Sequence, residues 1–83
     1  MPKRKKIKVI ERKLGREKAM GQAWMGEDLI EIDNRLNNKE YLFCLLHEVL
    51  HICFPNLSEK EVLKYEKVFG KTVWEQGYRR IHK

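Results

Sequence analysis

Alternating hydrophobic and polar residues predict strands in the first part of the chain. Residues 5–12 alternate in this way and are rich in β-branched side chains, which predicts a strand. Its many lysines are typical of an edge strand. Residues 18–25 and 29–33 predict two further strands, which a turn at residues 26–28 would join as a hairpin. We therefore expect a small antiparallel sheet of about three strands.

A different pattern begins at residue 39, where hydrophobic side chains occupy almost every direction around a helix as far as residue 54. This pattern predicts a helix that is buried on most sides. Asn37 or Asn38 can cap the start of this helix, and Pro55 helps to end it.

A second helix is predicted to begin at Glu59. Ser58 and Glu61 have the spacing of a capping box, and the hydrophobic stripe that follows should end near Gly77. The 83 residues fit a single minimal domain of the α+β class, covering residues 1–83, in which the sheet packs on two helices. So small a core gains from further stabilisation, for example by a bound metal.

Charge is distributed unevenly along the chain, whose formal net charge is +6. Residues 1–18 have a net charge of +7 and residues 62–83 one of +4, whereas residues 19–61 have one of −5. Basic ends of this kind can make weak contacts with nucleic acid or with an acidic protein surface. The alternative is that they form an ordinary solvated surface.

The cysteines indicate a reducing compartment. Cys44 and Cys53 lie on the first predicted helix, on opposite faces and roughly 13 Å apart along its axis. This separation excludes a disulfide between them, and free thiols are typical of the cytoplasm. No segment resembles a secretion signal, and the longest apolar stretch, residues 41–46, is too short to span a bilayer. We expect a cytoplasmic protein without a membrane segment.

The buried helix contains the pattern H-E-x-x-H at residues 47–51. His47 and His51 are one helical turn apart on the same face, so both imidazoles can bind one zinc ion, and Glu48 can reach a water on that zinc. These three are the only strongly polar side chains in residues 41–54, where burial is costly unless such groups are paired or bind a metal. The alternative is that backbone carbonyls satisfy both histidines.

A catalytic zinc has three protein ligands and one open position, so a third ligand must come from elsewhere. Glu59 opens the second helix, and a short loop would fold that helix back against His51. Glu66 lies nearly two turns further on, on a similar side. We favour Glu59, although a glutamate in the first turn is also explained by the helix dipole. Cys44 could supply a thiolate ligand, but it is more simply a small core residue.

Three stretches carry a resemblance to a known group of enzymes: residues 30–33, residues 46–51 and residues 54–62. They resemble the small zinc metallopeptidases often encoded by phages, which in turn are similar to the SprT-like and ImmA/IrrE-like zincins. The resemblance implies a strand-rich first part over two packed helices, with His47, His51 and Glu59 on zinc and Glu48 as the general base.

The sequence thus predicts a minimal zincin-like metallopeptidase that hydrolyses a protein or peptide substrate with a zinc-activated water. The strand near residues 21–25 could align an extended substrate by adding it to the sheet. The alternative is a basic module that binds nucleic acid or protein, with zinc structural or absent.

Overall fold

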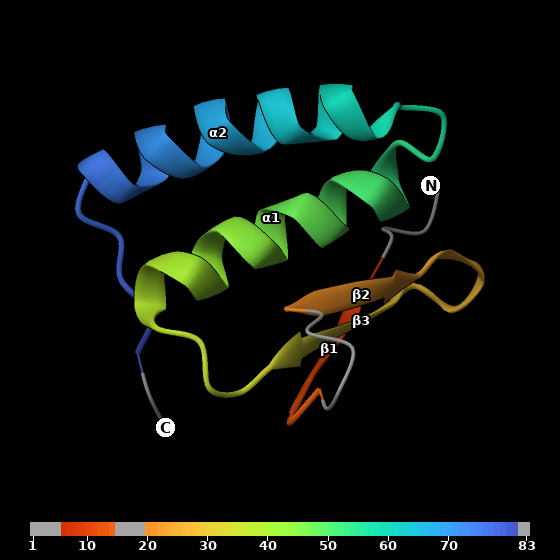
Figure 1. The fold of residues 1–83 in the computed structure, drawn as a ribbon, viewed down its shortest axis with the longest axis horizontal. Coiled ribbons are helices and arrows are strands. Elements are labelled where there is room, and N and C mark those ends of the chain that lie inside the picture. Colours follow the sequence, from red (N-terminus) through yellow and green to blue (C-terminus); the bar gives the residue numbers. More distant parts are fainter. Residues whose placement is uncertain (1–5, 15–19, 82–83) are drawn as a thin grey trace.

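The computed structural model describes residues 6–14 and 20–81, and it confirms the α+β class. The described elements are β1 (Lys8–Arg12), β2 (Gly21–Trp24), a 3-10 helix (Met25–Glu27), β3 (Leu29–Asp33), α1 (Asn38–Cys53) and α2 (Glu59–Glu75). Helix α1 lies between α2 and the sheet, so it contacts both layers (Figure 1). None of the helices in the described ranges meets the length and apolarity that a bilayer crossing requires.

The sheet is mixed, with strand order β1-β3-β2. Strands β2 and β3 form the predicted antiparallel hairpin, and β1 lies at an edge as predicted. However, β1 pairs with β3 in parallel, so the expectation of a wholly antiparallel sheet was wrong in this pair. Side-chain alternation identifies the faces of a strand but not the direction of its neighbour. Predicted strand residues 5, 18 and 19 lie outside the described residues.

The central strand β3 supplies the middle of the hydrophobic core. Ile30 and Ile32 are fully buried and cluster with Tyr41 and Ile52 of α1. Successive side chains of a strand point to opposite faces, so Glu31 between them points away from this cluster. The sheet therefore packs on α1 through the face of β3 that carries Ile30 and Ile32.

On that other face, Glu31 links all three strands. Its carboxylate accepts hydrogen bonds from Arg12 of β1 at 2.5 Å, and from Gln22 and Trp24 of β2 at 2.6 and 2.9 Å. Although only 9% of Glu31 is exposed, these donors hold the pKa of its carboxyl at about 2, with the hydrogen bond from Arg12 as the largest cause. The buried charge is thereby compensated.

Both helices begin at capping boxes. Asn37 accepts from the backbone of Glu40 at 2.8 Å, which decides between the two predicted caps of α1. Ser58 and Glu61 form the second predicted box, with hydrogen bonds of 2.9 and 3.1 Å. Helix α2 ends two residues before the predicted end at Gly77. The capping box at Ser58 fixes the start of α2 at Glu59.

Two glycines allow the neighbouring elements to approach α1 closely. A Cβ atom at Gly70 of α2 would lie 2.6 Å from the ring of Phe43, and one at Gly21 of β2 would lie 2.5 Å from the sulfur of Cys44. Real Cβ atoms essentially never come so near another heavy atom. The glycine inside α2, which weakens a helix locally by about 1 kcal/mol, is thus required by the packing of the two helices.

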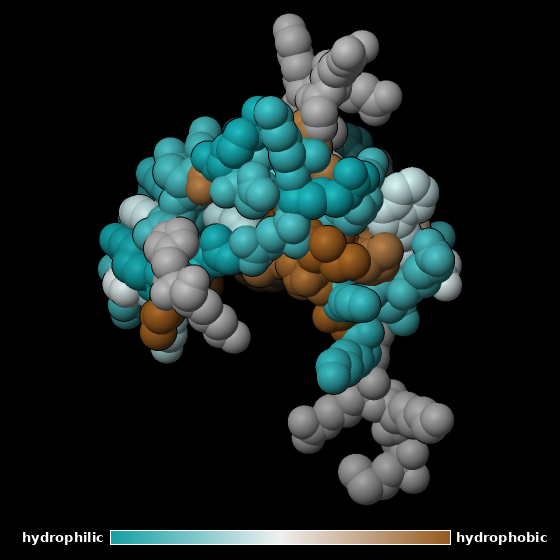
Figure 2. Space-filling model, turned by 90° about the horizontal axis from the view of Figure 1, so that it is seen from below, coloured by the Kyte–Doolittle hydropathy of each residue, from teal (hydrophilic) through white to brown (hydrophobic). Residues whose placement is uncertain are grey.

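Helix α1 is less buried than its sequence predicts. Its buried residues include Tyr41, Leu50 and Ile52, but Phe54 at its end is 55% exposed. Both cysteines are free, as expected: Cys53 is exposed and Cys44 is partly buried. Seen from below, hydrophilic residues cover much of the coloured surface, and the largest group of hydrophobic residues lies near its centre, with smaller ones toward the edges (Figure 2).

Candidate metal centre

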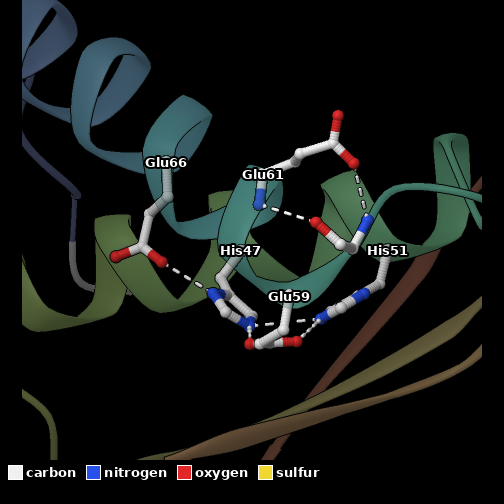
Figure 3. A network of polar contacts seen from close by, with 6 residues as sticks. His47, His51, Glu59, Glu61 and Glu66 are labelled. Carbon is white, nitrogen blue, oxygen red and sulfur yellow. Dashed lines mark hydrogen bonds and ion pairs between the residues drawn. The ribbon is translucent and has the colours of Figure 1, made fainter.

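Three predicted ligands come together where α1 meets the first turn of α2 (Figure 3). The Nε2 atoms of His47 and His51 are 3.2 Å apart. The carboxylate of Glu59 lies across both rings, with Oε1 at 2.7 Å from Nε2 of His47 and Oε2 at 2.9 Å from Nε2 of His51. One ligand atom from each residue thus lies within 4.8 Å of the others.

Local structure explains this convergence. The histidines are four residues apart on α1, which places both imidazoles on one side of the helix. The chain then reverses between α1 and α2, where the amide of Leu57 donates to the carbonyl of Phe54 at 3.0 Å. Because the cap at Ser58 starts α2 immediately afterwards, Glu59 is its first residue and faces the two histidines.

Glu66 approaches His47 from the opposite side of the ring. Its Oε1 lies 2.6 Å from Nδ1 of His47, and only 17% of each side chain is exposed. A carboxylate can only accept, so Nδ1 carries the hydrogen and donates it to Glu66. Of the two acids that the sequence offered as a third ligand, Glu59 therefore meets both Nε2 atoms, and Glu66 contacts the other ring nitrogen of His47.

The hydrogen on Nδ1 leaves Nε2 of a neutral His47 as an acceptor. A neutral His47 then has its lone pair on Nε2, which faces Oε1 of Glu59 at 2.7 Å. Two acceptors at this distance repel each other unless a second proton or a metal cation lies between them. The short distance between Nε2 of His47 and Oε1 of Glu59 therefore fits either a His–Glu ion pair or a cation bound between the two atoms.

The donor set suits zinc. Imidazole nitrogens and carboxylate oxygens are among its usual ligands, and bonds of 2.0–2.1 Å place tetrahedral ligand atoms roughly 3.3–3.4 Å apart. The observed separation of 3.2 Å between the Nε2 atoms of His47 and His51 is close to this value. Glu59 would complete the set, and its side chain is 60% exposed.

Glu48 lies beside the three candidate ligands but is not one of them. Only 8% of it is exposed, and burial is the largest cause that raises the pKa of its carboxyl. The neighbouring acids Glu59 and Glu66 raise this pKa further, whereas the two histidines lower it. Glu48 and His47 both line a groove of about 630 Å³, so a molecule in the groove would meet both side chains.

Cys44 does not join the cluster. Burial is the main cause that raises the pKa of its thiol to about 12, so the sulfur keeps its proton at neutral pH. Within residues 6–14 and 20–81, the group that could hold a metal ion consists of His47, His51 and Glu59. The described residues therefore bring together three candidate ligands and not four.

The sequence analysis did not predict that Glu66 contacts Nδ1 of His47. It considered Glu66 only as an alternative third ligand. The available signal was its position seven residues after Glu59, nearly two turns along the same side of α2.

No family model, curated protein or solved structure matches this chain. Its chemistry is therefore argued from the geometry of the centre.

Proposed function

We propose that this protein is a zinc-dependent metallopeptidase in which His47, His51 and Glu59 bind the metal and Glu48 is the general base. The observation that carries the proposal is the convergence of two imidazole nitrogens and a carboxylate next to a groove that Glu48 also lines. The sequence resemblance to small zincins supports the same assignment. When bound, zinc supplies Lewis acidity, which lowers the pKa of water and polarises a carbonyl group.

Glu48 has the properties of a group that accepts and returns a proton. It accepts a proton from the attacking water and donates it to the leaving amine, so one water is consumed for each peptide bond broken. Burial moves the pKa of its carboxyl upward, toward neutral pH, which favours both transfers. It follows His47 directly on α1, which places it next to the proposed metal ligands.

The number of ligands favours catalysis over a purely structural metal. A structural zinc is enclosed by four protein ligands, whereas a catalytic zinc keeps one position open. Three ligands gather in the described part of the chain, and the raised pKa of the Cys44 thiol disfavours it as a fourth. The groove is lined by His47 and Glu48, so a substrate in it would lie next to one proposed ligand and the proposed base.

The test compares Glu48→Gln with Glu75→Gln, which changes an exposed glutamate at the end of α2. Hydrolysis of unfolded casein should fall by roughly 100-fold or more in Glu48→Gln, the usual scale of a general base, and should be unchanged in the control. Zinc content and melting temperature should match the wild type in both variants, because neither residue is a ligand.

Other results would contradict the proposal in different ways. Purified protein that takes up no zinc would identify the centre as a cluster of ion pairs. Zinc-loaded protein that cleaves no substrate would favour the alternative, a basic binding module with a structural metal. If Glu48→Gln cleaves casein as fast as the wild type, another group is the base.

A further inference from the structure

The groove beside the metal centre extends in one direction only. His47, Glu48 and Glu66 line one end of it, and Asn37, Lys39 and Glu40 at the start of α1 line the other. On α1, none of the lining residues comes after Glu48. The groove therefore runs from the centre toward the N-terminal end of α1, over roughly 15 Å of helix axis.

Apolar side chains line the part of the groove between these ends. Phe43 and Cys44 come from α1, Leu63 from α2, and Met20 from the start of the β2 segment. Leu63 and Met20 are each 45% exposed. Large apolar side chains that surround a cavity without covering it are typical of a ligand site, because an apolar ligand releases water from them.

The apolar lining is held in place by the close contacts at the two glycines. The ring of Phe43 packs against Gly70, and the sulfur of Cys44 packs against Gly21. A cavity whose sides are already ordered loses little conformational entropy when a ligand binds. The volume of about 630 Å³ lies within the range of small-molecule and peptide sites.

We propose that this groove binds the substrate on one side of the cleaved bond and selects a large apolar side chain there, in contact with Phe43, Leu63 and Met20. The inference rests on the proposed function, because its occupant is the peptide that reaches His47 and Glu48. A length of roughly 15 Å accommodates about four residues of extended peptide. The substrate class is thus a flexible protein segment with an apolar residue beside the cleaved bond.

Binding is tested without hydrolysis. Zinc-loaded protein is titrated with N-acetyl-phenylalaninamide and with N-acetyl-serinamide, and chemical shifts of the backbone amides are followed by NMR. The phenylalanine probe should bind about tenfold or more tightly and shift the amides of Gly21, Phe43 and Leu63. Leu63→Ser should reduce this preference, whereas Val68→Ser, at a comparably exposed position of α2 outside the lining, should not.

Cleavage-site mapping on casein separates this inference from the proposed function. An apolar residue enriched at one position beside the cleaved bond, and lost in Leu63→Ser, supports both. Cleavage without such enrichment, or equal binding of the two probes, overturns the groove inference and leaves the peptidase intact. Selective binding of the phenylalanine probe without any cleavage supports an apolar binding site and contradicts the proposed peptidase activity.

Discussion

Nδ1 of His47 donates to Oε1 of Glu66 across 2.6 Å, on the side of the ring that faces away from Glu59. A carboxylate at this position fixes both the tautomer and the orientation of a histidine ligand, and it makes the other nitrogen more basic. His47 is therefore held between two acids of one helix, each of which contacts a different ring nitrogen.

The two acids should differ in their effect on zinc affinity. Glu59→Gln removes a proposed ligand, whereas Glu66→Gln keeps an oxygen that accepts from Nδ1 of His47. We expect the larger loss in Glu59→Gln, and a loss of about 10- to 100-fold in Glu66→Leu, which removes the acceptor. Competition titrations with a zinc chelator measure all three. The reverse order would make Glu66 the ligand.

Removal of zinc should destabilise the fold. A metal that binds only the native state adds stability, about 4 kcal/mol when free zinc exceeds its dissociation constant 1,000-fold. For a domain of 83 residues this corresponds to a shift of roughly 15–30 °C in melting temperature. Calorimetry with and without a chelator measures it, with magnesium as the control ion. An unchanged melting temperature after complete removal of bound zinc would refute the prediction.

The pH dependence of stability should report on Glu31. Because its pKa is lowered from 4.5 to about 2 in the folded protein, its contribution is complete above about pH 4.5 and is lost as the pH falls toward 2. In Glu31→Gln, the free energy of unfolding should therefore change less with pH across this window. Part of the pH dependence should remain in this variant, because the pKa of Asp33 is also lowered in the folded protein.

Urea denaturation at several pH values measures this slope. Glu75→Gln serves as the control, because it removes an exposed carboxyl from the end of α2. Equal slopes in the wild type and Glu31→Gln would mean that the contacts with Arg12, Gln22 and Trp24 do not hold the charge of Glu31 in solution.

Gly70→Ala should destabilise the protein even though alanine favours helices. The added methyl group would overlap the ring of Phe43, and overpacking of this kind costs about 1–3 kcal/mol, more than the gain of about 1 kcal/mol in helix propensity. Phe43→Leu should reduce the penalty when combined with Gly70→Ala, which a double-mutant cycle detects. Gly26→Ala, where nothing lies within 4 Å, should change stability by less than about 0.5 kcal/mol.

Local signals in the sequence predicted most of the fold. Capping boxes at Asn37 and Ser58 and the turn before Leu29 depend on residues that are close together in the chain, so their structures follow from local chemistry. The direction of β1 depends on the path of its connection across β3, which no local pattern specifies.

The candidate site divides in the same way. The positions of His47 and His51 follow from helix geometry, and the cap at Ser58 brings Glu59 within reach. The contact of Glu66 with Nδ1 depends on how α2 packs on α1, and this packing requires the ring of Phe43 to lie against Gly70. Residue spacing gives the side of a helix but not its distance from a partner.

The two ends of the α1–α2 hairpin are held by different interactions. At the closed end, Glu59 reaches across to His47 and His51, whereas toward the open end the ring of Phe43 lies on Gly70. Amide hydrogen exchange would measure the opening free energy of each end separately, because different parts of a protein open locally with different free energies. If a cation binds at the closed end, its removal should lower the protection of amides at the start of α2, while the amides around Gly70 should stay protected until the whole domain unfolds.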